Sequence, residues 1–122
     1  MEVLRHSAQD RTPYLFFDGD KGELIIRGRC IPEDAKDFFK DLHNLMQEYE
    51  KNPREILEAT FDLEYFNTAT AKELMSLLYR FKKFPSHVTW CHEMKDRDMI
   101  DVGKDFEEIL QTVPFTFQEV ER

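Results

Sequence analysis

A strand followed directly by a helix is indicated by residues 56–81, ILEATFDLEYFNTATAKELMSLLYRF. From Ile56 to Tyr65 apolar and polar residues alternate, which predicts a strand with one packed face. The packed face is expected to carry Leu57, Ala59, Phe61, Leu63 and Tyr65. Beyond Asn67 the apolar residues recur every three or four positions, which predicts an amphipathic helix. Its start fits a capping box over Thr70–Glu73, with Thr68 just outside that box.

A hairpin and a first helix are predicted before this unit. Tyr14–Phe17 and Glu23–Arg27 are short apolar runs around the turn-forming residues Asp18–Gly22. The helix has Pro32 at its start, should end near Asn52–Pro53, and carries one continuous apolar stripe. That stripe comprises Ala35, Phe38, Phe39, Leu42, Leu45, Met46 and Tyr49. The polar, aperiodic residues 1–12 are expected to form a flexible arm.

The region after Pro85 predicts a strand, a helix and a strand. His87–His92 contains Val88 and Trp90 and is predicted to be a strand. A third helix is indicated by apolar residues spaced three or four apart and interrupted by Gly103, and Phe115–Phe117 forms a last short strand. These helix positions are Met99, Val102, Phe106, Ile109 and Leu110. The prediction is therefore an α/β fold, a mixed sheet with three main helices in the order ββαβαβαβ, forming one domain over residues 13–122.

Composition narrows the classes of function. The chain has 122 residues, a net charge of -8 and 41% hydrophobic residues, and a domain of this size buries about two-thirds of its surface. The acidic balance disfavours nucleic-acid binding, because phosphates require clustered Lys and Arg. The sequence has neither an apolar signal segment nor a run of 18 apolar residues, so a cytoplasmic protein is expected. Cys30 and Cys91 form neither a disulfide framework nor a zinc motif.

Catalytic chemistry has little support in the sequence. The four glycines form no phosphate-binding loop. Cys91 and His92 are adjacent on a strand and point to opposite faces. We therefore expect no catalytic residue, metal ligand or cofactor. Two alternatives stay open: a metal-assisted hydrolase or transferase, and an adaptor that binds through the polar face of the strand at residues 56–65. The first would use His92, Asp96 and Asp98, and the second Glu58, Thr60, Asp62 and Glu64.

The junction from Tyr65 to Lys72 places two hydroxyl groups, those of Thr68 and Thr70, at the start of a helix. Threonine is a preferred cap, so both are explained by helix capping alone. A phosphoryl group on either would add roughly -1.5 to -2 charges beside the positive end of the helix dipole. Such a modification would change a binding surface without unfolding the domain.

The sequence resembles the SiaC family of bacterial regulatory phosphoproteins from Thr12 to about Phe117. The most specific part of the resemblance is Leu63–Thr68, with the signature Tyr-Phe-Asn-Thr. It is accompanied by Thr12–Tyr14, Gly22–Gly28, Pro32–Ala35, Trp90 and the stretch from Asp98 to Phe106. The resemblance implies a fold similar to the STAS domains of anti-sigma factor antagonists.

The same resemblance implies a non-enzymatic partner switch. A dedicated kinase phosphorylates the threonine after the asparagine in that family, and a PP2C-type phosphatase removes the phosphate. The matching residue is Thr68, with Thr70 as a second choice because Ala69 and Thr70 replace the usual serines. In that family the unphosphorylated protein can bind and activate a diguanylate cyclase, which raises cyclic di-GMP and promotes aggregation or biofilm formation. The expected partner-binding residues are Tyr65, Phe66, Asn67, Thr68, Thr70 and Lys72.

Overall fold

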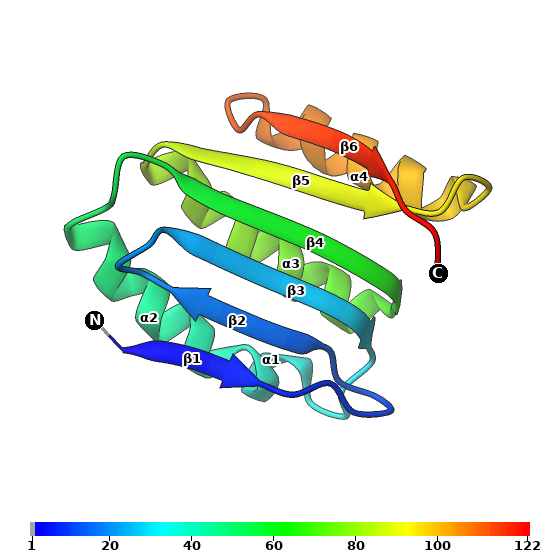
Figure 1. Ribbon diagram of the computed structural model, residues 1–122, viewed down its shortest axis with the longest axis horizontal. Helices are drawn as coiled ribbons and strands as arrows, with labels where there is room; N and C mark the ends of the chain where they lie inside the picture. Colours follow the sequence, from blue (N-terminus) through cyan, green and yellow to red (C-terminus); the bar gives the residue numbers. More distant parts are fainter. Residues whose placement is uncertain (1) are drawn as a thin grey trace.

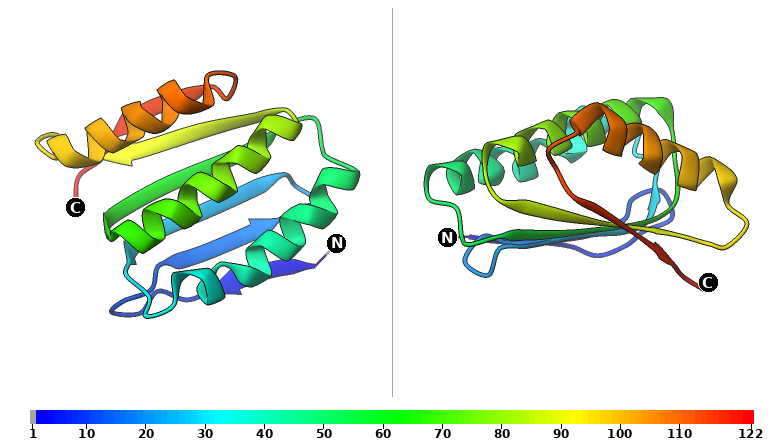
Figure 2. Two further views of the ribbon diagram at one scale, coloured as in Figure 1. Left: turned by 180° about the vertical axis from the view of Figure 1, so that it is seen from behind. Right: turned by 90° about the horizontal axis from the view of Figure 1, so that it is seen from above.

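A six-stranded mixed sheet carries all the helices on one face (Figures 1 and 2). The computed structural model describes residues 2–122. The sheet strands are β1 (Val3–His6), β2 (Tyr14–Asp18), β3 (Glu23–Cys30), β4 (Leu57–Phe66), β5 (Ser86–His92) and β6 (Phe115–Glu119). The helices are α1 (Ala35–Phe38), α2 (Lys40–Lys51), α3 (Thr68–Arg80), the 3-10 turn η1 (Phe81–Lys83) and α4 (Arg97–Leu110). The predicted α/β fold with a mixed sheet is confirmed.

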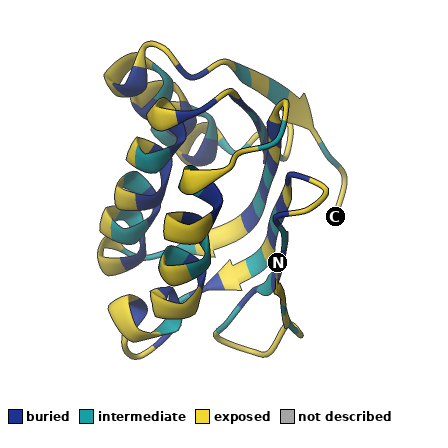
Figure 3. Cartoon of the chain, turned by 90° about the vertical axis from the view of Figure 1, so that its left-hand side faces the viewer, coloured by how far each residue is buried: buried dark blue, intermediate teal, exposed yellow. Residues whose placement is uncertain are grey.

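The strands lie side by side in the order of the sequence. β1, β2 and β3 pair antiparallel, whereas β3 to β6 pair parallel. The core fills the space between the sheet and the helices, and none of the described helices covers the opposite face of the sheet (Figure 3). Alternate strand residues such as Ile26, Phe61 and Trp90 point into the core, where they meet helix residues such as Met46 and Leu78. No helix in residues 2–122 combines the length and hydrophobicity needed to cross a membrane.

The predicted flexible arm is corrected for Val3–His6, which forms the edge strand β1. Leu4 pairs with Phe17 of β2 and packs against the core. The His6 ring contacts Phe38 edge-on at 5.1 Å, and its Nδ1 lies 3.0 Å from the carbonyl oxygen of Pro13. A four-residue strand is too short to show a period in the sequence, so its formation depends on these contacts. Met1 lies outside the described residues.

The prediction of one continuous helix that starts at Pro32 is wrong in two respects. It begins later, at Ala35, because the Asp34 carboxylate accepts the Asp37 N–H and caps the first turn. It is also divided at Phe39, whose φ of -89° and ψ of -1° separate α1 from α2. The Phe39 side chain is fully buried, so the apolar stripe continues across a break in the helix that the periodicity did not reveal.

The end of β4 contains a register shift that changes which side chains face the core. Gly28 pairs with Leu63, but the next residue, Arg29, pairs with Tyr65, so Glu64 is an extra residue on β4. The alternation is therefore inverted beyond Glu64. Tyr65, predicted to be packed, is 55% exposed, while Phe66 turns inward to an edge-on contact with the Trp90 ring at 6.4 Å.

The helix α4 approaches the sheet closely at Gly103. A Cβ atom at this position would lie 2.5 Å from Cδ1 of Trp90. The indole Nε1–H of Trp90 donates a hydrogen bond of 2.9 Å to the Met99 carbonyl on the same helix. The glycine that interrupts the apolar pattern thus allows a close approach of α4 to the sheet, and α4 continues through it.

Candidate functional site

The junction between β4 and α3 holds the residues singled out by the sequence. Asn67 has extended backbone angles, φ -97° and ψ 178°, and is the N-cap of α3. Its side-chain oxygen accepts the N–H of Thr70 at 2.9 Å. The predicted capping box is therefore wrong, since the cap lies three residues before Thr70 and Thr68 is the first residue of the helix. Asparagine is among the preferred N-caps, and its position after the strand sets the start of α3.

The two threonines of this junction have opposite environments. Thr70 is completely buried, and its Oγ1–H donates a hydrogen bond of 3.0 Å to the carbonyl oxygen of Cys30 at the end of β3. Thr68 is exposed. A protein kinase could reach the Thr68 hydroxyl on the folded domain, whereas access to Thr70 would require the first turn of α3 to separate from β3.

The other four predicted partner-binding residues also divide into exposed and half-buried ones. Tyr65 and Lys72 are exposed, and Lys72 follows Thr68 by four positions, on the same side of α3. Phe66 and Asn67 are half-buried, with the first packed on the core and the second capping the helix. Among the predicted partner-binding residues, those exposed at the junction are therefore Tyr65, Thr68 and Lys72, with Ala69 exposed between them.

Two hollows flank this junction. A groove of about 580 Å³ lies between α1 and α3 and contains Thr68. We call it the Thr68 groove; its lining residues are Glu33, Asp34, Ala35, Lys36, Thr68, Ala69, Lys72 and Glu73. A second hollow of about 330 Å³ on the other side is lined by Glu64, Tyr65, Phe66, Asp96, Asp98, Met99 and Val102. The junction thus borders recessed surface on both sides.

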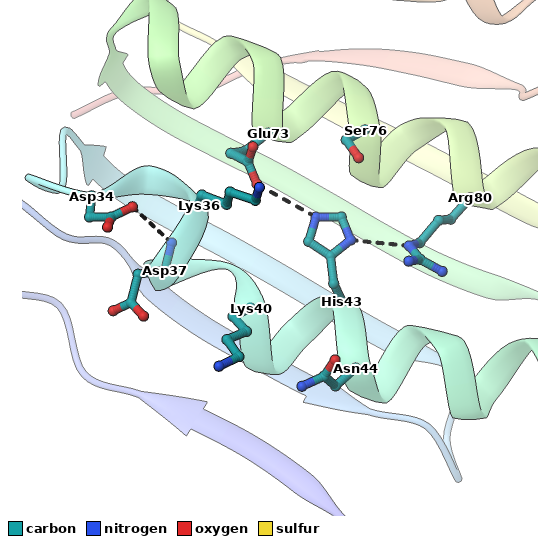
Figure 4. Close-up of a pocket in the computed structure, with 9 residues that line it drawn as sticks. All are labelled: Asp34, Lys36, Asp37, Lys40, His43, Asn44, Glu73, Ser76 and Arg80. Carbon is teal, nitrogen blue, oxygen red and sulfur yellow. Dashed lines mark hydrogen bonds and ion pairs between the residues drawn. The ribbon is translucent and has the colours of Figure 1, made fainter.

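A third groove, of about 550 Å³, separates α1 and α2 from α3 and contains a half-buried histidine (Figure 4). His43 accepts a hydrogen bond of 3.1 Å on Nδ1 from Nε of Arg80, and its Nε2 lies 3.8 Å from the Glu73 carboxylate. Arg80 also forms an ion pair of 2.8 Å with Glu50. Burial and, secondarily, the Arg80 charge lower the pKa of His43. No sequence pattern indicates this cluster, because 37 positions separate His43 from Arg80.

The geometry does not favour the metal-dependent alternative. Asp96 caps α4 by accepting the Met99 N–H at 3.1 Å, and His92 Nδ1 lies 2.9 Å from the Glu93 carbonyl. Over residues 2–122, no three His, Cys, Asp or Glu side chains are grouped closely enough to hold a metal ion.

The face proposed for an adaptor is partly engaged within the molecule. Glu58 pairs with His87 at 2.8 Å, and Asp62 pairs with Arg122 near the end of the chain. Glu64 is the extra residue of the β4 register shift and does not continue the alternation of Glu58 and Asp62. The four polar residues of β4 therefore do not form one free acidic row.

Comparisons with known proteins agree on one family. The model of the SiaC family, described as regulatory phosphoproteins, matches residues 6–120. A curated relative from Pseudomonas aeruginosa strain UCBPP-PA14, named only as an uncharacterized protein, is 22% identical over an alignment of 123 positions that covers 97% of each chain.

Solved structures show the same fold. The crystal structure of apo-SiaC from Pseudomonas aeruginosa matches with a TM-score of 0.87 and 23% identity, covering 97% of this chain and 99% of that one. The crystal structure of the diguanylate cyclase SiaD in complex with its activator SiaC, from the same organism, contains a chain that matches with a TM-score of 0.84 and 21% identity, covering 96% of this chain and 99% of that one.

Proposed function

Because this chain belongs to the SiaC family of regulatory phosphoproteins, we propose that it is a non-enzymatic partner switch. A cognate kinase phosphorylates Thr68, and a PP2C-type phosphatase reverses the modification. The unphosphorylated form binds and activates an output protein in the cytoplasm. A diguanylate cyclase is the proposed output, which would link the protein to cyclic di-GMP signalling and biofilm formation.

The observation that carries the proposal is the environment of the two threonines. Thr68 is exposed at the first position of α3, whereas the hydroxyl of Thr70 is buried against the Cys30 carbonyl. This difference supports Thr68 as the acceptor over Thr70. The SiaC chain in the solved complex is named as the activator of a diguanylate cyclase, which supports an enzyme of that class as the output.

Phosphorylation would release the output protein by electrostatics. A docked partner that covers Thr68 must remove its side chain from water. A phosphothreonine carries roughly -1.5 to -2 charges at neutral pH, and burying that charge costs more than a typical interface contact contributes. Its position on a domain of net charge -8 adds repulsion toward an acidic partner. The switch therefore requires no change of fold.

The modification itself is tested by mass spectrometry. The protein is isolated from its own host, and its intact mass and phosphopeptides are measured with and without phosphatase treatment. A phosphatase-sensitive phosphoryl group on Thr68 is expected. Absence of any phosphopeptide that contains Thr68, over several growth conditions, would contradict the proposal.

Partner release is tested by charge substitution. Thr68→Glu should weaken binding of the output protein by at least about tenfold in calorimetry, equivalent to a loss of about 1.4 kcal/mol. Gln47→Glu adds the same charge at an exposed position of α2 and should leave binding unchanged. Equal affinities for Thr68→Glu and wild type would rule out the repulsion mechanism.

A further inference from the structure

Two lysines from different helices line the Thr68 groove. Lys36 belongs to α1 and Lys72 to α3, and both line the groove together with Thr68. Figure 4 shows the Lys36 side chain extending from α1 toward Glu73 of α3. Lys72 lies one helical turn beyond Thr68. The two lysines therefore line, from two different helices, the same hollow as Thr68.

Both lysines are available to bind an anion. Neither ammonium group forms an ion pair with a carboxylate anywhere in residues 2–122. Three acids line the same groove: Glu33, Asp34, which accepts the Asp37 N–H at 3.0 Å, and Glu73, which lies 3.8 Å from the His43 ring. An added phosphate would thus meet two lysines that form no ion pair within the described residues and whose charges oppose the repulsion from these carboxylates.

We propose that Lys36 and Lys72 together bind the phosphoryl group of phosphorylated Thr68, so that the modification links α1 to the start of α3. The inference rests on the proposed phosphorylation of Thr68 and adds how the modified residue is held. Phosphate oxygens are strong acceptors, and lysine binds them as a mobile point charge on a long stem. The N-terminus of α3 offers the phosphate one N–H group fewer, because the Thr70 N–H is already donated to the Asn67 side chain.

The proposal is tested on protein that carries phosphothreonine at position 68 from genetic encoding, so that no kinase is needed. Phosphorus NMR follows the second ionisation of the phosphate, for which an isolated phosphothreonine has a pKa of about 6. Nearby cations stabilise the dianion and lower this pKa. Lys36→Met and Lys72→Met should each raise it by about 0.3–0.7 unit, the shift that corresponds to partly exposed ion pairs, and the double variant by more.

Lys51→Met is the matched control. It removes the same charge at the exposed end of α2, far from Thr68 (Figure 1), and should leave the phosphate pKa unchanged. If Lys36→Met and Lys72→Met also leave it unchanged, the lysine pair does not bind the phosphate. If Thr68 is never phosphorylated in the host, the proposed function is refuted. The NMR titration does not depend on that result, because it measures on encoded phosphothreonine whether the two lysines bind the phosphate.

Discussion

Thr70 joins the first turn of α3 to the end of β3 through one buried hydrogen bond. Thr70→Val keeps the shape of the side chain but leaves the Cys30 carbonyl without this donor. We expect the free energy of unfolding to fall by about 1–2 kcal/mol in urea titrations. Thr68→Val, made at the exposed first helical position, should change it by less than about 0.5 kcal/mol. Equal losses for the two variants would show that the Thr70 contact does not hold the junction in place.

Gly103 allows α4 to lie against the sheet. A Cβ at this position would come within 2.5 Å of Trp90 Cδ1 and 2.8 Å of Phe117 Cε2, so the indole or the helix must move. We expect Gly103→Ala to destabilise the domain by about 1–3 kcal/mol, although alanine is the better helix former. The near-ultraviolet circular dichroism of Trp90 should change as well. Asp105→Ala, at an exposed position of α4, is the control and should preserve both properties.

Among the elements, α2 and α3 are coupled by the cluster around His43. Burial and the Arg80 charge penalise the protonated imidazole, so the pKa of His43 in the folded protein is below the unfolded value of 6.5. As the pH falls below 6.5, the unfolded chain binds a proton that folded His43 does not. Stability should therefore decrease with falling pH down to the folded pKa and depend no further on His43 below it.

This pH dependence is measured by urea unfolding between pH 7.5 and pH 5 or below, as far as the protein stays soluble. The slope of stability against pH should be smaller in His43→Gln than in wild type, because the variant lacks the titrating imidazole. Substitution of an exposed residue of the same helix, Gln47→Ala, should retain the wild-type slope. Identical slopes in His43→Gln and wild type would exclude His43 as the source.

At the scale of the whole molecule, the sheet separates two buried thiols. Cys30 lies in the core beneath the helices, and Cys91 is buried in β5. Burial raises the pKa of the Cys30 thiol to about 11. The pKa of Cys91 is raised too, first by burial and then by the Asp62 carboxylate. Both thiols are therefore protonated at neutral pH and poorly reactive.

Thiol reactivity should consequently report unfolding of the entire domain. At pH 8, both cysteines should react with a disulfide reagent at least about tenfold more slowly in the native protein than in urea. The variants Cys30→Ala and Cys91→Ala assign the rates to single residues. Fast labelling of Cys30 in native protein would mean that the region between β3 and α3 opens without global unfolding.

The order of elements follows from local patterns, which is why most of the fold was predictable. The alternation in Leu57–Leu63 and the helical spacing from Ala71 to Phe81 each depend on residues a few positions apart. The same patterns failed where a distant contact changed the outcome. The β4 register shift exposes Tyr65, and the edge strand β1 forms because Leu4 and His6 have partners elsewhere.

By itself the sequence determined the alternation of strands and helices, and it placed Thr68 and Thr70 at a strand-to-helix junction. Only the tertiary structure decided which hydroxyl is exposed, because the donor of Thr70 meets an acceptor 40 residues away. It also brought Lys36 to the groove of Thr68 and His43 to Arg80. Local periodicity reflects which face of an element is apolar, whereas burial and charge at one residue depend on which other elements pack against that face.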